Sequence, residues 1–99
     1  MSKRPDPRAV RFDLGDFVVD AEVASLLSFA DVQGLVARHG RGDWGRVSPL
    51  RKAQNEAFTH PKNRALGSRA ESIHLHRGVS VAIITQQKAK RRQTRLFLI

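Results

Sequence analysis

Hydrophobic and polar positions first follow a strand-like spacing and then a helical one. Alternating apolar residues between positions 12 and 19 predict a short first strand, in which Gly15 permits a bulge or turn. Asp20 is a suitable N-cap for a short helix over about 21–27, because the apolar residues of that stretch then share one face. The chain is therefore expected to open with one strand and one helix.

A second helix is expected from Ser28 to Gly40. Ser28 and Asp31 approximate a capping box, and Gly40 is a common type of C-terminal stop. Gly34 lies inside this helix and weakens it by about 1 kcal/mol relative to alanine, unless something packs closely there. The predicted apolar face consists of Phe29, Val32, Leu35 and Val36.

A third helix is predicted after the glycine-rich segment 40–45, which we expect to be irregular. Ser48-Pro49 provides an N-cap followed by proline at the first helical position. This helix is expected to end near Thr59. Its predicted apolar stripe consists of Leu50, Ala53 and Ala57.

The remaining pattern predicts strands. Residues 72–76 alternate, Arg77-Gly78 supplies a turn, and residues 79–84 are apolar on both sides, as in a strand covered on both faces. A charged loop over 88–92 then leads to a last strand at 96–99. Two hairpins in succession indicate an antiparallel meander.

These elements predict an α+β domain with an N-terminal short strand and two to three helices packed on a C-terminal three-stranded antiparallel β-meander. Residues 11–99 are expected to form this single domain. Residues 1–10, with two prolines and several charges, are expected to be a flexible basic arm. The last strand would lie at the sheet edge and offer a second copy a pairing surface, which would permit a homo-oligomer.

Composition excludes several protein classes. The 99 residues include no cysteine, so disulfides and thiolate metal sites are excluded. The longest apolar runs are only a few residues, too short to span a membrane. The charged N-terminus leads into no hydrophobic segment and does not look like a signal peptide. We expect a cytoplasmic protein of bacterial type that needs no cofactor.

Charge is distributed unevenly along the chain. Residues 41–99 contain thirteen Lys and Arg against three Asp and Glu, whereas residues 1–40 contain five against six, which together give +9. Such a field attracts polyanions, namely nucleic acid, a nucleoprotein or an acidic protein surface.

The densest basic cluster lies at the expected tip of the last hairpin. Two or three charges are enough to keep an edge strand from pairing with another chain, and five cations within eight residues exceed that number. Such a cluster could contact phosphates, and Gln87 or Gln93 could read base edges. The candidate polyanion-binding residues are Lys88, Lys90, Arg91, Arg92 and Arg95, with Arg41, Arg46, Arg51 and Lys52 as a further group near the glycine loop and third helix.

The segment Gly42-Asp43-Trp44-Gly45 contains the only tryptophan. An exposed Trp44 would offer a ring for stacking on a base. The favoured interpretation is that Trp44 fills the core, Asp43 caps a helix or turn, and the glycines allow a tight loop around a large side chain.

The histidines suggest two further hypotheses. His74 and His76 share one strand face, a spacing compatible with a metal pair, but we favour histidines on the solvated face of a sheet and expect no metal. His39, Asp43 and Arg46 would be the acid/base set of a ribonuclease-type toxin, which is the least favoured function.

Four segments occur in this order: His39-x-x-Gly42-Asp43-Trp44-Gly45, Asn55-Glu56-Ala57, Ile83-Ile84-Thr85 and Thr94-x-Leu96. Their arrangement resembles a group of small bacterial proteins associated with plasmids and integrated elements. The resemblance covers roughly residues 14–98. It implies a single small domain of mobile-element origin and carries over no catalytic residue. Where that group has an acidic segment, this chain has the basic stretch 86–92, so the positive charge is expected to be its own specialisation.

We therefore expect a small basic non-enzymatic binding protein that engages nucleic acid or a nucleoprotein through its C-terminal half. The alternative is a protein–protein inhibitor or accessory module that docks on an acidic partner surface.

Overall fold

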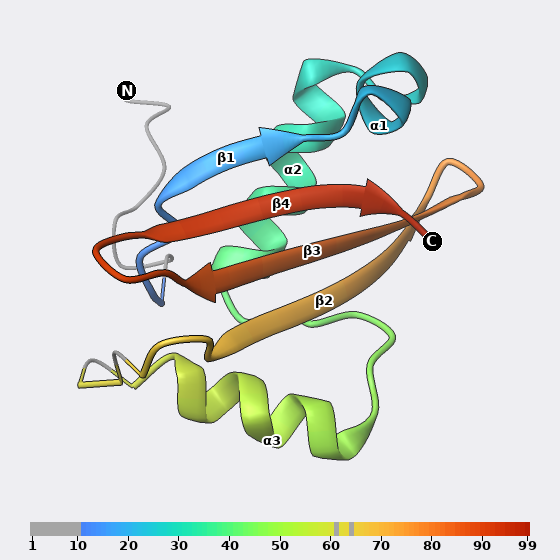
Figure 1. The fold of residues 1–99 in the computed structure, drawn as a ribbon. Helices are drawn as coiled ribbons and strands as arrows, with labels where there is room; N and C mark the ends of the chain where they lie inside the picture. Colours follow the sequence, from blue (N-terminus) through green and yellow to red (C-terminus); the bar gives the residue numbers. More distant parts are fainter. Residues whose placement is uncertain (1–10, 61, 64) are drawn as a thin grey trace, which may run out of the picture.

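The elements follow the expected order. The computed structural model describes residues 11–60, 62–63 and 65–99; the arm expected over 1–10 lies outside them. The α+β class is confirmed (Figure 1). The elements are β1 (Asp16–Val19), α1 (Ala21–Leu26), α2 (Phe29–Gly40), α3 (Pro49–Phe58), β2 (Arg69–His76), β3 (Val79–Gln87) and β4 (Arg92–Leu98).

The four strands form one sheet in the order β1-β4-β3-β2. The pairs β2–β3 and β3–β4 are antiparallel, which confirms the meander, whereas β1 runs parallel to β4. The expectation that the last strand lies at the edge is therefore wrong, since β1 covers its outer side (Figure 1). Residue Asp20, just after β1, fixes this pairing: its N–H donates to Leu96 O at 3.0 Å, and its carboxylate accepts from Arg95.

The two faces of the sheet differ. Helices α1 and α2 lie against one face and close the main core, whereas none of the described helices crosses the other face (Figure 1). The main core consists of Val23, Leu27, Leu35, Val81, Ile83 and Leu96. We call the second one the uncovered face; strand alternation and register place on it Asp16, Val18, Arg69, Glu71, Ile73, Leu75, Ser80, Ala82, Ile84, Gln86, Gln93, Arg95 and Phe97.

Helix α2 begins as the sequence predicts and ends slightly later. The N–H of Asp31 donates to Ser28 Oγ at 3.0 Å, and the N–H of Ser28 donates to the Asp31 carboxylate at 3.1 Å, which completes the capping box. Gly40 is still helical. The chain turns at Gly42, which has φ of 86° and donates its N–H to His39 O.

Helix α3 starts at the predicted cap, with the N–H of Arg51 donating to Ser48 Oγ at 3.0 Å. The predicted apolar stripe is wrong: Leu50 is exposed, and the buried residues are Asn55 and Phe58. Since α3 lies beside the edge strand β2 rather than across a sheet face (Figure 1), much of its contact is with the backbone of that strand. A second core cluster forms here from Phe12, Trp44, Phe58 and Ala70.

Candidate nucleic-acid interface and the buried polar centre

The predicted hairpin tip is the turn between β3 and β4. Lys88, Lys90 and Arg91 are exposed there, and the N–H of Lys88 donates to Arg91 O at 2.7 Å to close the turn. We call these three residues the basic tip. Lys88 and Lys90 form no ion pair with any described residue, so their charge is available to a partner.

Arg92 belongs to the core and not to this surface. It is only 4% exposed, its Nε donates to Gln87 Oε1 at 2.8 Å, and its Nη2 donates to Asn63 O at 2.9 Å. Its guanidinium carbon lies 4.3 Å from the centre of the Phe58 ring. Because side chains alternate along a strand, Arg92 lies on the same side of β4 as the buried Leu96, which is the helix side. This alternation could have shown that Arg92 is buried, whereas the distribution of charge could not.

The uncovered face changes from polar to apolar along the strands. Nearest the basic tip, Arg69, Gln86 and Gln93 lie side by side across three strands. The next row contains Ile84 and Arg95, and the row beyond it is apolar. A shallow groove of about 230 Å³ runs along this part of the face, lined by Ile84, Gln86, Lys88, Gln93, Arg95 and Phe97.

Arg91 of the basic tip and two cations beside it, Arg69 and Arg95, are already paired. Arg95 makes two bonds of 3.0 Å to the carboxylate of Asp20, which raise the pKa of Arg95 and lower that of Asp20. Arg91 lies 3.5 Å from Asp16, and Arg69 pairs with Glu71. The side chains of Arg91 and Arg95 are 70% and 55% exposed, and exposed pairs of this kind contribute little stability, so these two guanidiniums remain accessible to a competing anion.

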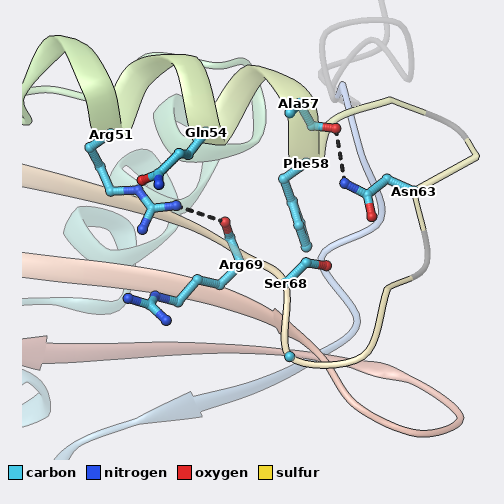
Figure 2. A pocket seen from close by; sticks show the side chains of 8 residues that line it. Arg51, Gln54, Ala57, Phe58, Asn63, Ser68 and Arg69 are labelled. Carbon is cyan, nitrogen blue, oxygen red and sulfur yellow. Dashed lines mark hydrogen bonds between the residues drawn. The ribbon is translucent and has the colours of Figure 1, made fainter.

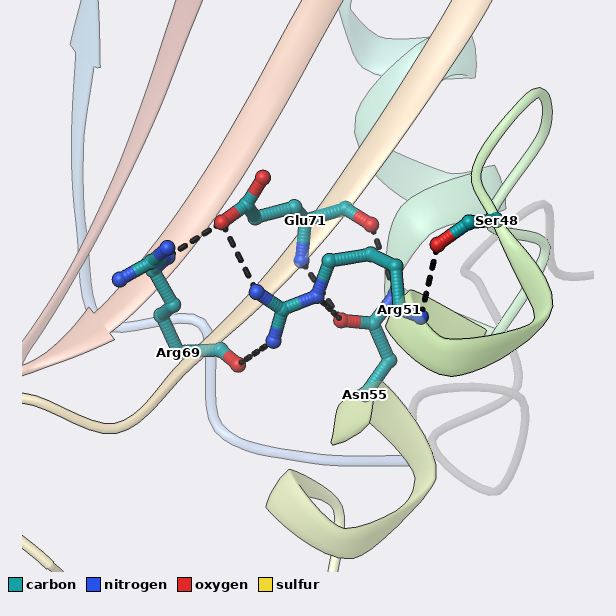
Figure 3. A network of polar contacts seen from close by, with 5 residues as sticks. All are labelled: Ser48, Arg51, Asn55, Arg69 and Glu71. Carbon is teal, nitrogen blue, oxygen red and sulfur yellow. Dashed lines mark hydrogen bonds and ion pairs between the residues drawn. The ribbon is translucent and has the colours of Figure 1, made fainter. Parts of the chain in front are cut away.

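The second predicted basic group is not brought to the basic tip. The turn between β3 and β4 and the start of α3 lie at opposite ends of the molecule (Figure 1). Arg41, Arg46 and Lys52 are exposed, but Arg51 is part of the fold. Its guanidinium donates to Glu71 Oε2 at 3.0 Å and to Arg69 O at 3.2 Å (Figure 3).

A polar pocket of about 300 Å³ lies between α3 and the start of β2 (Figure 2). Gln54, Phe58 and Ser68 line it, together with Arg51 and Arg69. The guanidiniums of Arg51 and Arg69 are both ion-paired with the carboxylate of Glu71. This pairing weakens the electrostatic attraction of the pocket for an added anion. We therefore place the candidate interface at the basic tip and not in this pocket.

The glycine-rich loop closes the outer edge of β2. Trp44 is buried, as favoured from the sequence, and its Nε1 donates to Glu56 at 2.8 Å. Gly45 has φ of 67° and pairs with Ile73, and a side chain there would overlap the Ile73 carbonyl. The N–H of Arg46 donates to Ile73 O at 2.8 Å, and the N–H of Ile73 donates to Trp44 O at 3.1 Å.

Side chains of α3 close the rest of this edge. Asn55 donates to Glu71 O at 2.7 Å and accepts from the N–H of Glu71 at 2.9 Å, and Arg51 bonds Arg69 O (Figure 3). The outward backbone groups of β2 are thus occupied from Arg69 to Ile73. The sequence pattern gave no sign of this arrangement, because the pairing residues lie 16 or more positions apart.

His39 is fully buried in a chain of hydroxyl groups. Its Nδ1 lies 2.6 Å from Ser72 Oγ, and its Nε2 lies 2.9 Å from Thr85 Oγ1. Thr94 donates to Leu14 O, so Thr85 must donate to Thr94, and Thr85 must then accept from His39 Nε2. The neutral Nε2–H tautomer follows. Burial, with a contribution from His74, lowers the pKa of His39 to about 3.

The predicted ribonuclease set is therefore not assembled as an exposed site. His39 has no solvent-exposed surface, and both of its ring nitrogens are bonded. Asp43 instead accepts from Arg38 Nε at 2.8 Å, and this guanidinium lowers the pKa of Asp43. Arg46 is exposed on the loop.

His74 and His76 share a face as expected, but the solvated position favoured for them is wrong. His74 is 2% exposed and faces the helices, and neither ring nitrogen has a hydrogen-bond partner among the described residues. Burial lowers the pKa of His74, and Arg38 adds to this effect. His76 lies 2.9 Å from the carboxylate of Asp31 and helps to lower the pKa of that carboxyl. Across the described residues, no three His, Cys, Asp or Glu side chains are grouped as a metal site.

Comparison with known proteins gave no match to a family model, a curated protein or a solved structure. In the part of the chain that the structure describes, no helix is both long and apolar enough to cross a lipid bilayer.

Proposed function

We propose that this chain is a non-enzymatic nucleic-acid-binding protein that contacts phosphates through the basic tip and the adjoining part of the uncovered face. The observation that carries the proposal is the position of Lys88, Lys90 and Arg91 on one exposed turn. Their charge stands beside a sheet face that no described helix crosses (Figure 1).

Two kinds of contact are available to a bound strand. Lys88, Lys90, Arg91 and Arg95 can contact phosphates, and four such contacts give a log–log salt slope of about −3 to −4 on duplex DNA. Behind them, Gln86 and Gln93 present side-chain amides, which both donate and accept hydrogen bonds and can reach base edges.

The test is a fluorescence-anisotropy titration of short duplex DNA, single-stranded DNA and RNA at two salt concentrations. The test variant is Lys88→Glu/Lys90→Glu/Arg91→Glu, with Arg92 left intact because it is buried. We expect affinity to fall at least about tenfold in this variant, since three phosphate contacts are lost. The affinity of the wild-type chain should fall steeply as salt rises.

A matched control is Arg41→Glu/Arg46→Glu/Lys52→Glu, which changes the net charge by the same amount at exposed positions outside the basic tip. We expect this control to bind nearly as well as the wild-type chain. Equal losses in the two variants would show that net charge alone attracts the ligand and would contradict a contact at the basic tip. No salt-sensitive binding to any of the three nucleic acids would reject the proposal.

A partner protein with an acidic surface is the second candidate. It is favoured by the small number of aromatic rings available for stacking. Phe97 is the one aromatic side chain on the uncovered face, and the Arg95 guanidinium lies over its ring at 5.3 Å. Recovery of one defined protein after nuclease treatment, on wild type but not on the basic-tip variant, would support this candidate.

A further inference from the structure

The two edges of the sheet differ in whether their outward backbone groups have hydrogen-bond partners. Backbone and side-chain groups from the glycine-rich loop and α3 occupy the outer edge of β2. No described residue pairs with the outer edge of β1. Because the N–H of Asp20 bonds Leu96 O and parallel pairing uses alternate residues, Phe17 and Val19 direct their N–H and C=O groups outward. An open strand edge of this kind is a template for another strand.

An apolar groove of about 380 Å³ lies beside this edge, between β1 and α2. Phe17 and Val19 form one wall, and Phe29, Val32 and Val36 contribute to the other. Its remaining lining residues, Leu14, Gln33 and Ala37, carry no charge either. Phe29 is 76% exposed and Phe17 is 52% exposed, so two of the six aromatic residues of the chain lie open at this one place. Exposed apolar surface gathered in this way marks an interaction site.

The sequence of β1 favours a second copy as the occupant. Residues 16–20 are Asp-Phe-Val-Val-Asp, a pattern of acid, three apolar residues and acid that reads almost the same in both directions. An antiparallel pair centred on Val18 would set Phe17 opposite Val19 of the other copy. All four outward backbone groups on each strand would then be bonded, and the two grooves would meet on the same side of the sheet.

The charge distribution also favours a second copy at this edge. Residues 11–40, which include β1, α1 and α2, contain five acidic and two basic residues, whereas the whole chain has a charge of +9. Two copies therefore repel each other least here. Asp16 of one copy would lie opposite Asp20 of the other, but each is already paired with a guanidinium, from Arg91 and Arg95 respectively.

We propose that two copies of this chain associate through β1 to form a two-fold dimer with a continuous eight-stranded sheet, in which each copy covers the apolar groove of the other. This inference is independent of nucleic-acid binding. The two differ in their response to salt: screening reduces repulsion between two positive copies and favours the dimer, whereas salt weakens phosphate contacts.

The first test is sedimentation of the nuclease-treated full chain over a range of concentrations at moderate salt. We expect a mass that rises from one copy to two. Phe17→Lys should raise the dissociation constant at least about tenfold, because a buried Phe contributes more than one factor of ten. Leu50→Lys is the matched control: it makes the same kind of exposed apolar-to-lysine change on α3 and should leave association unchanged.

The second test locates the two-fold axis and remains informative if Phe17→Lys folds poorly. The chain has no cysteine, so Val18→Cys supplies a single thiol. The two copies of residue 18 would face each other as a pair without mutual hydrogen bonds. The Cα atoms of such a pair lie about 4.5 Å apart, within the range that a disulfide spans. We expect mild oxidation to link two copies of Val18→Cys but not of Leu50→Cys. A chain that stays a single copy at high concentration, or Val18→Cys that does not cross-link, would overturn the proposal, as would association only with an added apolar peptide.

Discussion

Acid should destabilise this fold well before its carboxylates titrate, because His39 is buried in its neutral form. Burial lowers the pKa of His39 from 6.5 to about 3. Between these values the unfolded chain binds a proton that the folded chain excludes, so the stabilisation is complete above pH 6.5 and is lost as pH falls. Each pH unit below 6.5 costs about 1.4 kcal/mol, which gives about 2 kcal/mol at pH 5. That is a large share of the stability of a small domain, typically about 5–15 kcal/mol.

The assay is urea unfolding at pH 7, 6 and 5 and constant ionic strength, followed by the fluorescence of Trp44. This residue is the only tryptophan, and the centre of its ring lies 5.5 Å from that of His39. The window stops at pH 5 because the carboxyls with lowered pKa, such as Asp43 and Glu56, lose their contribution only below their ordinary values of 3.8 and 4.5. His74, whose pKa is also lowered, should make the wild-type dependence steeper than that of a single proton.

The variant His39→Gln isolates the effect from the other histidines, since an amide donates and accepts hydrogen bonds without titrating. We expect it to be less stable than wild type at pH 7 but to lose about 2 kcal/mol less between pH 7 and pH 5. Ile83→Val, a buried change without a titrating group, is the control for general loss of stability and should keep the wild-type dependence. Equal pH dependence in wild type and His39→Gln would refute the argument.

Three further substitutions test individual contacts. Gly34→Ala should stabilise the fold by up to about 1 kcal/mol in thermal unfolding, because no described atom beyond the neighbouring residues and the local helix backbone lies within 4 Å of the added methyl group; a loss of stability would contradict this. Arg92→Lys should cost about 3 kcal/mol in urea unfolding, since a lysine cannot reproduce the forked bonds and the stacking on Phe58; a cost below about 0.5 kcal/mol would reject the buried role. Asn55→Ala should cost about 2 kcal/mol and speed amide exchange at Glu71, its backbone partner, whereas unchanged exchange there would show that this contact is not formed.

Local signals predicted most of the secondary structure. The caps at Ser28 and Ser48 depend on residues within one turn, so their side chains specify where α2 and α3 begin. The alternation of residues 79–84 likewise predicted which side chains of β3 share a face. The cover expected on both faces of this strand is wrong, because none of the described helices crosses the uncovered face (Figure 1). These are short-range effects, which a single sequence contains in full.

The errors arise where distant segments meet. The apolar stripe predicted for α3 assumed that this helix packs against a sheet face. It lies along the edge of β2 instead, where Asn55 is the buried residue because its side chain hydrogen-bonds the backbone of Glu71. His74 was expected to be solvated because histidine is polar. Ser72 of the same strand, however, bonds the buried His39, and strand alternation places His74 on the same inner face as Ser72. Arg92 was grouped with its basic neighbours because they are adjacent in the sequence. Its burial depends on the register of β4, which sequence adjacency does not show.

The occupied edge of β2 also affects how the chain behaves at high concentration. A sheet with two free edges can add strands at both sides, and repeated addition leads to fibres. Here the glycine-rich loop and Asn55 block one side, so strand addition at β1 uses the single remaining edge. Assembly by strand pairing would then end after one step instead of propagating. Loss of Gly45 or Asn55 would therefore turn a self-limiting protein into one prone to aggregation.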